Sequence, residues 1–284
     1  MSEKVALITG ASSGFGLLTT VEMAAAGYRV VATMRNLDRR QKLDDALASR
    51  NVQDRVTLLQ LDITQTATIP AVIDKIVADY GHIDVLLNNA GFAMAGFLED
   101  ITLDELRKQF ETNFFGHIAV TKTVLPVMRR QRSGHIIMVT SIGGRAAAPV
   151  IGSYAASKFA LEGWSEALRL EMQAVGIQVV LVEPGAYATD IWDRNAQLGE
   201  FAMDPNSPNA ARGRRFSEHI KKSVHRADAR DVARLILRIA EDPHPRLRYV
   251  AGTDAKVQLV LKNLLPWRSY EKMITKIMKI DRID

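Results

Sequence analysis

Residues 5–16 read Val-Ala-Leu-Ile-Thr-Gly-Ala-Ser-Ser-Gly-Phe-Gly, and this stretch decides the fold class. The apolar run that opens it is typical of a buried strand. Gly10, Gly14 and Gly16 then let the backbone turn sharply and approach a ligand. A helical segment follows, and the unpaired N–H groups at its N-terminus favour a phosphate. The spacing Gly-x-x-x-Gly-x-Gly differs from Gly-x-Gly-x-x-Gly and from the Gly-Lys-Ser/Thr of a P-loop. We therefore predict a phosphate-binding turn, with plain loop punctuation as the alternative.

Outward from this turn, short apolar runs alternate with longer segments of helical period as far as about residue 255. Parallel strands need a crossover connection, which a helix supplies, so the alternation predicts βαβ units. We expect an α/β fold with a doubly wound parallel sheet of about seven strands and helices on both faces. The expected strands are Val5–Thr9, Arg29–Thr33, Val56–Leu61, Ile83–Leu87, His135–Thr140, Gln178–Val182 and Arg248–Ala251. The expected helices cover residues 15–26, 38–49, 66–79, 102–132, 153–175 and 229–241.

Two segments interrupt the alternation. Residues 190–226 are polar, carry prolines and glycines, and follow a strand end, where open α/β sheets place ligands. We interpret them as an insertion that forms a substrate loop, either a mobile lid or a loop that stays solvated. Residues 256–284 form a tail beyond a single domain of residues 1–255.

The tail combines basic and apolar residues. It holds seven Lys or Arg and three Asp or Glu, and five apolar residues share one helical face: Tyr270, Met273, Ile274, Ile277 and Met278. This pattern predicts a basic amphipathic helix. Such a helix could pack on the core, cap the substrate pocket or join a neighbouring subunit. Peripheral contact with an anionic membrane is the less favoured alternative.

Composition excludes several classes of protein. With 47% apolar and 24% charged residues, the 284-residue chain is not disordered, collagenous or a coiled coil. The absence of cysteine excludes disulfides, thiolate metal sites and cysteine nucleophiles, and it suits a cytoplasmic location. The six histidines lack ligand spacing, so we predict no metal and expect solvated or helix-end histidines. We find no signal peptide or spanning segment, and the charge of +5 lies mainly in the tail, so no nucleic-acid partner is expected.

Further motifs follow the glycine turn in order along residues 4–252. They are Asp62 after the third strand, Asn88-Asn89-Ala90-Gly91, Asn113, Ser141, Tyr154-x-x-x-Lys158 and Pro184-Gly185-x-x-x-Thr189. Together these motifs resemble those of the short-chain dehydrogenase/reductase family. Residues 140–144 and 157–163 are most similar to the steroid- and retinoid-type dehydrogenases. The resemblance implies a Rossmann-like fold, a dinucleotide-binding catalytic domain in residues 1–255, and hydride transfer between a nicotinamide cofactor and a carbonyl or alcohol.

The end of the second strand bears on the choice of cofactor. An acidic residue there would bind the adenosine ribose hydroxyls and repel a phosphate. By resemblance that acid would fall at Met34, and Arg35 follows, whose guanidinium suits a phosphate. We therefore predict NADP(H) rather than NAD(H). A solvated Arg35 is the alternative, and Asp38 is a reservation because a loop shift would bring it to the ribose.

The resemblance assigns the other cofactor contacts. Asp62 would meet the adenine edge, residues 89–91 the adenosine side, and residues 184–189 the nicotinamide carboxamide. The full predicted set comprises Gly10, Ser12, Ser13, Gly14, Phe15, Gly16, Arg35, Asp62, Ile63, Asn89, Ala90, Gly91, Tyr154, Lys158, Pro184, Gly185 and Thr189.

Tyr154 and Lys158 are the central catalytic candidates, because residues four apart share one helix face. A nearby ammonium and a positive nicotinamide favour the phenolate, so we expect the pKa of Tyr154 to be lowered toward neutrality. Ser141 ends the preceding strand and can donate to the same substrate oxygen. By resemblance, Asn113 holds a water in a proton relay from the lysine; a buried amide at a backbone bend is the alternative.

The substrate pocket is expected between Ser141, Tyr154 and the insertion. Its predicted apolar lining is Phe92, Met94, Ile142, Val150, Tyr187 and Trp192, each with core packing as the alternative. These residues suit a bulky apolar carbonyl or alcohol. The family resemblance implies a homodimer or homotetramer joined through the helices at 102–132 and 153–175. Two other functions stay open: an NAD-linked steroid or retinol dehydrogenase, and a regulator that senses dinucleotide without turnover.

Overall fold

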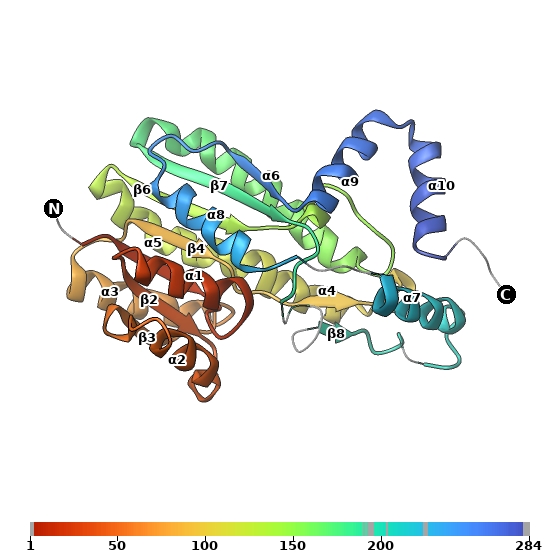
Figure 1. Cartoon of the computed structure of the whole chain (residues 1–284), viewed down its shortest axis with the longest axis horizontal. Coiled ribbons are helices and arrows are strands. Elements are labelled where there is room, and N and C mark those ends of the chain that lie inside the picture. Colours follow the sequence, from red (N-terminus) through yellow and green to blue (C-terminus); the bar gives the residue numbers. More distant parts are fainter. Residues whose placement is uncertain (1–2, 190, 192–195, 203, 224–226, 281–284) are drawn as a thin grey trace.

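Seven parallel strands form the central sheet of the computed structural model, which describes residues 3–280 apart from 190, 192–195, 203 and 224–226. The strand order is β3-β2-β1-β4-β6-β7-β9 (Figure 1). The strands are β1 (Val5–Thr9), β2 (Arg29–Met34), β3 (Val56–Gln60), β4 (Val85–Asn88), β6 (Gly134–Val139), β7 (Ile177–Pro184) and β9 (Arg248–Ala251). The predicted α/β fold, with seven strands in one domain, is confirmed.

The order of the strands reverses direction at β1. From β1 the chain first builds outward to β2 and β3, and it then crosses to β4 on the other side and continues to β6, β7 and β9. All six pairings between neighbouring strands are parallel. In such a sheet, loops diverge at the carboxyl ends of the two strands beside the reversal, which here are β1 and β4. A crevice is therefore expected between the segments that follow Thr9 and Asn88.

Helices cover both faces of the sheet, and each face has its own apolar core. One core joins β1 and β2 residues to α1 and α8, and includes Leu17 and Ile236. The other joins the sheet to α3, α5 and α6, and includes Ile73, Val124 and Leu161. The helices are α1 (Gly14–Ala25), α2 (Gln41–Ala48), α3 (Ile69–Tyr80), α4 (Leu103–Phe110), α5 (His117–Gln131), α6 (Gly152–Met172), α7 (Ala210–Ser223), α8 (Arg230–Glu241), α9 (Thr253–Leu264) and α10 (Trp267–Ile277).

The single helix expected over residues 102–132 is interrupted. A π-helical turn, Glu111–Gly116, separates α4 from α5. The side-chain amide of Asn113 in this turn bonds to both backbone atoms of Phe92, which explains why the helix widens here. Short 3₁₀ turns complete the described elements: Leu37–Arg39, Gln53–Arg55, Thr66–Thr68, Leu98–Asp100, Ile142–Gly144 and Gln173–Val175.

The segment expected to be a substrate loop contains regular structure. It includes α7 and the strand β8 (Ala196–Leu198), which pairs in parallel with β5 (Ala93–Ala95) in a small second sheet. The insertion expected over residues 190–226 therefore includes a short strand and a helix, and its role as a substrate loop stays a prediction. Arg212 connects α7 to other parts of the chain, because it lies over the Phe97 ring at 4.7 Å and donates to the Ile280 carbonyl at 3.2 Å.

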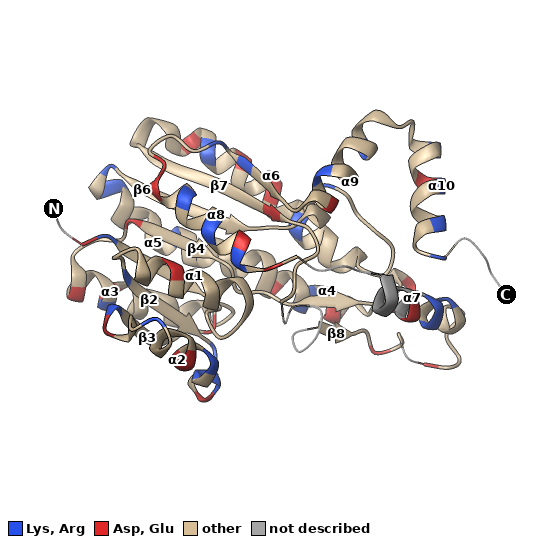
Figure 2. Ribbon diagram, viewed as in Figure 1, with Lys and Arg blue, Asp and Glu red and all other residues tan. Residues whose placement is uncertain are grey.

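The tail forms two helices, α9 and α10, which project from the body on the side of α7 (Figure 1). Tyr270 is buried, whereas Ile277 on the same predicted face is half exposed. Figure 2 shows basic and acidic residues interleaved along α6 and α8 on the face in view. No helix among the described residues is long and apolar enough to cross a membrane.

Candidate active site

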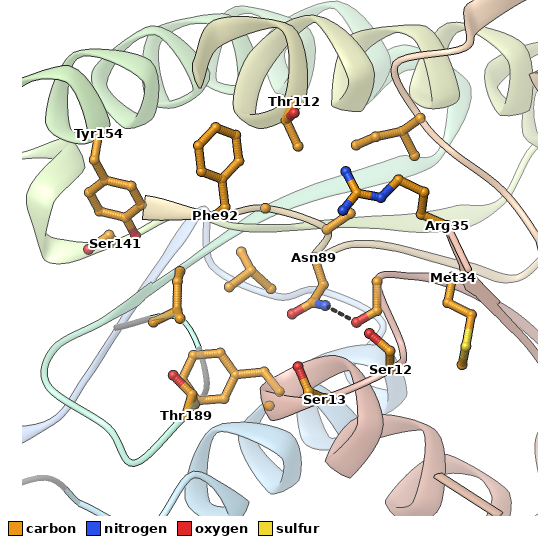
Figure 3. Close-up of a pocket in the computed structure, with 18 of the residues that line it drawn as sticks. Ser12, Ser13, Met34, Arg35, Asn89, Phe92, Thr112, Ser141, Tyr154 and Thr189 are labelled. Atoms are coloured by element: carbon orange, nitrogen blue, oxygen red, sulfur yellow. Dashed lines mark hydrogen bonds between the residues drawn. The ribbon is translucent and has the colours of Figure 1, made fainter. Parts of the chain in front are cut away.

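The main cavity lies at the carboxyl ends of the strands, at the reversal of strand order, and has a volume of about 490 Å³. Residues from the glycine turn, the ends of β2, β3, β4, β6 and β7, and helix α6 line it. Figure 3 shows Ser12, Ser13 and Asn89 in the middle of this cavity, with Arg35 on one side and Tyr154 and Ser141 on the other. The structure thus brings the predicted phosphate turn and the predicted catalytic groups into one site.

The turn after β1 requires glycine at three positions. Gly10 and Gly14 have φ values of +71° and +56°, in the left-handed region that other residues rarely adopt. A Cβ on Gly16 would lie 2.3 Å from the Gly10 carbonyl oxygen and 2.4 Å from Asn89 Nδ2. The same Asn89 amide donates to the Thr9 and Gly10 carbonyl oxygens at 2.9 and 3.0 Å (Figure 3). The Asn89 side chain therefore holds the turn in place through two of its backbone carbonyls.

Helix α1 presents free backbone donors to the cavity. Its N-cap is Ser13, whose side chain makes no capping hydrogen bond. Both Ser12 and Ser13 line the cavity, and the first N–H groups of a helix attract a phosphate. Phe15 also lines the cavity, and its ring meets the ring of Tyr187 edge-on with 5.7 Å between centroids.

The end of β2 carries two arginines that line the cavity, Arg35 and Arg39. The Arg35 guanidinium points into the cavity (Figure 3), and its backbone carbonyl accepts a hydrogen bond from Gln60 at 3.1 Å. Asp38 is not among the lining residues, and its backbone N–H donates to the Asn36 side chain at 2.8 Å. Arg39, which the sequence did not single out, thus lines the cavity together with Arg35.

The segments after β3 and β4 form the next part of the wall. Asp62, Ile63 and residues 89–91 all line the cavity. One Asp62 oxygen accepts hydrogen bonds from the backbone and the hydroxyl of Thr64, at 3.0 and 2.7 Å. These bonds fix the carboxylate within its own turn.

A buried histidine supports this wall. His117 Nε2 lies 2.5 Å from the Ala90 carbonyl oxygen, and since a carbonyl can only accept, the proton is on Nε2. Burial, with a further contribution from Lys158, lowers the pKa of His117 to about 3, so the ring is neutral at physiological pH. His117 begins α5 as a helix-end residue, but it is fully buried and not solvated. Nothing in its spacing in the sequence pointed to this contact.

Ser141, Tyr154 and Lys158 meet at the other end of the cavity. The hydroxyls of Tyr154 and Ser141 lie side by side (Figure 3), and Ser141 Oγ also accepts from the Gly143 N–H at 3.0 Å. Lys158 Nζ lies 5.7 Å from the centre of the Tyr154 ring and donates to the Val139 carbonyl at 2.8 Å. Both Tyr154 and Lys158 are buried. The geometry places two hydroxyls where one substrate oxygen can contact both.

The pKa of Tyr154 differs from the sequence-based expectation. Burial raises the pKa of Tyr154 to about 12, against a smaller lowering by a hydrogen bond from Ser141. Burial also lowers the pKa of Lys158 to about 8, although the Glu162 carboxylate opposes this. In the chain alone, desolvation of the phenolate thus outweighs the hydrogen bond from Ser141, and the expected lowering of the Tyr154 pKa beside a positive nicotinamide stays a prediction. The tyrosine stands as a neutral phenol, the form that can donate a proton.

Asn113 is buried, and the contacts of its side chain are all structural. Its Oδ1 accepts from the Phe92 N–H at 3.2 Å, and its Nδ2 donates to the Phe92 carbonyl at 2.9 Å and to Ser157 Oγ at 3.4 Å. The amide thus ties the π turn to the segment that follows β4. A role for Asn113 in a proton relay stays a prediction.

The segment at the end of β7 lines one wall of the cavity, and a residue at the start of α9 holds this segment in place. Pro184, Gly185, Tyr187 and Thr189 line the cavity. Asp254, in the first turn of α9, accepts a hydrogen bond from the Ala186 N–H at 2.7 Å. A Cβ on Gly185 would lie 2.4 Å from this carboxylate, which explains why glycine is needed there. No motif in the sequence singled out Asp254.

The predicted substrate lining is only partly gathered at the cavity. Phe92 and Tyr187 line it, whereas Met94, Ile142 and Val150 do not, and Trp192 falls outside the described residues. Met94 is instead a core residue whose N–H donates to Gln109. Several lining residues were not predicted from the sequence, among them Lys108, Thr112, Ile191 and Gln197. Among the described residues, no three His, Asp or Glu side chains are grouped as a metal site needs.

Comparisons with known proteins agree with this geometry. The family model described as short chain dehydrogenase matches residues 4–198. The uncharacterized oxidoreductase YusZ of Bacillus subtilis is 40% identical over 97% of this chain and 99% of its own length. Human retinol dehydrogenase 8 is 35% identical over 86% of this chain and 80% of its own length.

Solved structures give the same result. A short-chain dehydrogenase from Streptomyces avermitilis has a TM-score of 0.81 and 34% identity, covering 99% of this chain and 98% of its own. A structure described as ElxO with NADP bound has a TM-score of 0.72 and 26% identity, covering 88% of this chain and 96% of its own. The resemblance seen in the sequence motifs is therefore confirmed, including its nearness to the retinoid-type dehydrogenases.

Proposed function

This chain belongs to the short-chain dehydrogenase/reductase family, and we propose that it transfers hydride between NADP(H) and a carbonyl or secondary-alcohol substrate. The observation that carries the proposal is the pairing of the Tyr154 and Ser141 hydroxyls, with Lys158 beneath the tyrosine, in the same cavity as the glycine turn. An oxidoreductase of this kind needs a dinucleotide cradle and a proton donor at one site, and these residues supply both.

The chain's own residues handle the proton. When bound, the nicotinamide supplies or accepts the hydride. In reduction, Tyr154 donates its proton to the substrate oxygen, and Ser141 donates a hydrogen bond to that oxygen as negative charge develops on it. The buried Lys158 ammonium, fixed by the Val139 carbonyl, stabilises the resulting phenolate. Oxidation reverses these steps. Asn113 supports them by holding the π turn, and the proposal retains it as part of the relay.

The preference for NADP(H) rests on charge at the end of β2. Arg35 points into the cavity, Arg39 also lines it, and neither residue pairs with a carboxylate of the described chain. Met34 stands where an acidic residue would repel a 2′-phosphate. The structural relative with NADP bound supports the same assignment. An NAD-linked steroid or retinol dehydrogenase is the second candidate, because retinol dehydrogenase 8 is among the relatives.

The apolar character of Phe92, Tyr187 and Ile191 favours a bulky apolar substrate. We further propose that the protein is cytoplasmic and forms a homodimer or homotetramer. This part rests on the family, whose members are commonly oligomeric, and on the lack of cysteine in the chain.

Fluorescence titration with NADPH and NADH tests the cofactor assignment. We expect Arg35→Ala to weaken NADPH binding at least about tenfold and to leave NADH binding unchanged, since a phosphate–guanidinium contact contributes about 1.5–3 kcal/mol. Arg40→Ala is the matched control, because Arg40 pairs with Asp44 and does not line the cavity. Tighter binding of NADH that is insensitive to Arg35→Ala would defeat the preference.

Turnover of NADPH against a broad panel of carbonyl compounds tests the reaction. Tyr154→Phe should lower kcat by about 100-fold or more, as for loss of a general acid, and should spare cofactor affinity. Tyr80→Phe is the control, because the Tyr80 hydroxyl bonds to Thr57 and does not line the cavity. A wild-type protein that binds cofactor but turns over no panel member would instead support a dinucleotide-sensing regulator.

A further inference from the structure

A cluster of charged and polar side chains, built around two buried carboxylates, adjoins the residues on either side of Ser141. It comprises Thr140, Arg145, Glu162, Glu183 and Arg248, and below we call it the ionic cluster. Glu183 is fully buried and Glu162 is 5% exposed. Arg248 on β9 contacts both carboxylates, with its Nε 2.9 Å from Glu162 and 3.3 Å from Glu183. Of these five residues only Thr140 lines the main cavity, so the proposed reaction leaves the carboxylates and arginines without a role.

Two residues of α6 form hydrogen bonds with two consecutive residues at the end of β6, Val139 and Thr140. Lys158 donates to the Val139 carbonyl at 2.8 Å. One helical turn later, Glu162 Oε1 accepts from the Thr140 hydroxyl at 2.7 Å. The next residue along the chain is Ser141. These two bonds therefore tie the residues that lead into Ser141 to α6, the helix that carries Tyr154, while Thr140 also contacts the Val182 carbonyl on β7 through its hydroxyl at 3.0 Å.

The turn that follows Ser141 packs on the same part of α6. A Cβ on Gly144 would lie 3.1 Å from Glu162 Cγ and 3.1 Å from the Lys158 carbonyl, so the turn Ile142–Gly144 has little freedom to shift. Arg145, just after this turn, lies 3.5 Å from Glu183. The Ser141 segment is thus tied to the ionic cluster at both ends, through Thr140 and through Arg145.

Stability alone does not account for such a cluster. Burying a carboxylate costs several kcal/mol, and apolar side chains of similar volume are often as stabilising as a buried ion pair. A buried polar network does, however, impose one arrangement on the groups that it joins. The group it would arrange here is the catalytic hydroxyl of Ser141.

We propose that Glu162 is a positioning residue: by accepting from Thr140 and pairing with Arg248, it holds the Ser141 hydroxyl against that of Tyr154. This inference rests on the proposed function, in which both hydroxyls contact the substrate oxygen. Its expected signature is a loss in kcat without a loss in cofactor affinity, because the cofactor contacts of the glycine turn lie elsewhere.

Four variants test the inference. Glu162→Gln removes the negative charge that pairs with Arg248 and turns one of the two accepting oxygens into an NH2 group that can only donate, and Thr140→Val removes the hydroxyl. Thr140→Ser keeps that hydroxyl and serves as the conservative rescue. Glu166→Gln is the matched control, because Glu166 also pairs with Arg248 but from the exposed side of α6. We expect Glu162→Gln and Thr140→Val each to lower kcat about tenfold or more, with KM for NADPH within about twofold, and the double variant to cost no more than either.

A second measurement does not depend on turnover. Hydrogen exchange of residues 141–146 reports the order of the Ser141 segment, including the Gly143 N–H that Ser141 accepts from. Exchange in this segment should accelerate in Glu162→Gln and Thr140→Val, and should match wild type in Thr140→Ser and Glu166→Gln. If the wild type turns over no carbonyl, the proposed function fails. The exchange data still decide whether Glu162 and Thr140 hold the Ser141 segment in place.

Two outcomes would overturn the inference. In the first, Glu162→Gln and Thr140→Val lower the melting temperature but keep wild-type kcat well below that temperature, which would make the cluster a purely stabilising feature. In the second, exchange of residues 141–146 is unchanged in both variants.

Discussion

The main cavity has two ends, which we call the cofactor end and the catalytic end after their proposed roles. At the cofactor end the backbone itself sets the shape, whereas at the catalytic end buried charged side chains set it. The cofactor end consists of the turn Gly10–Gly16 braced by Asn89, where missing Cβ atoms leave the necessary room. The catalytic end consists of Ser141, Tyr154 and Lys158, supported by carboxylates and guanidinium groups that lie behind the cavity wall.

The difference predicts how each end responds to change. A steric constraint between backbone atoms does not depend on pH and fails completely when one atom is added. A buried ionic network contains groups that titrate, so its contribution varies with pH. A substitution at one end of the cavity should leave the other end unchanged as its reference.

Gly16→Ala should have the largest effect. The new Cβ would lie 2.3 Å from a backbone oxygen and 2.4 Å from the Asn89 amide, so either the turn or its brace must move. Overpacking of this kind costs about 1–3 kcal/mol or more. We expect NADPH affinity, measured by fluorescence titration, to fall by about 100-fold, since each 1.4 kcal/mol is a factor of ten.

Gly163→Ala is the control for this substitution. Gly163 lies within α6, and a Cβ there would meet nothing within 4 Å. Alanine should therefore stabilise the helix by about 0.5–1 kcal/mol and leave cofactor affinity unchanged. Wild-type affinity in Gly16→Ala would show that the turn is not held as the structure describes.

Glu183→Gln should remove a pH dependence of the free energy of unfolding that arises at the catalytic end. Burial, and then the nearby Glu162, raises the pKa of Glu183 to about 7, against the opposing effects of Arg145 and Arg248. Between pH 4.5, the ordinary value, and pH 7, the unfolded chain loses this proton while the folded chain retains it. Wild-type stability should therefore fall as pH rises through this window, by about 2 kcal/mol. Glutamine cannot ionise, so the variant should lack this fall in urea unfolding at pH 5 and pH 8.

Glu166→Gln provides the reference for that measurement. Hydrogen bonding to Arg248 lowers the pKa of Glu166, so its contribution changes only below pH 4.5 and leaves the slope between pH 5 and pH 8 as in wild type. A Glu183→Gln variant with the wild-type slope would mean that Glu183 is already ionised at pH 5 in the folded protein.

The same contrast explains how much could be predicted from the sequence. The glycine turn between β1 and α1 could be predicted almost residue by residue, because glycines between a strand and a helix act locally. All seven strands of the main sheet could be predicted as well, because runs such as Val30–Thr33 are β-branched and buried. Asp62 and residues 89–91 followed from the family motifs.

What could not be predicted depends on contacts between distant residues. Strands β5 and β8 have only three residues each, lack β-branched side chains and pair across about a hundred residues. Helix α7 is polar on most sides and so has no clear apolar period. The ionic cluster joins Arg145 to Glu183 and Glu162 to Arg248, pairs that no local spacing indicates.

Asp254→Ala should have a smaller effect on cofactor binding than Gly16→Ala. The carboxylate accepts from the Ala186 N–H and lies against Gly185, in the segment assigned to the nicotinamide. A single exposed hydrogen bond contributes about 1 kcal/mol, so KM for NADPH should rise about fivefold, with little change in kcat. Glu271→Ala, an exposed residue of α10, should leave KM unchanged. An equal rise in both variants would point to a general effect of the tail.

Leu264→Gln should have the smallest effect, because the outer face of α9 contacts neither end of the cavity. Leu264 is 76% exposed, whereas Leu259 on the inner face of the same helix is 8% exposed. An exposed substitution usually changes stability by less than about 0.5 kcal/mol, while a polar group on the buried face carries a desolvation cost of about 1–3 kcal/mol. We expect Leu264→Gln to leave both the melting temperature and NADPH affinity at their wild-type values, and Leu259→Gln to lower the melting temperature. Because Asp254 lies in the first turn of α9, loosening the inner face should also raise KM for NADPH in Leu259→Gln. A large loss of stability in Leu264→Gln would show that this outer face is covered in solution, and the tail would then have to be treated as part of an interface.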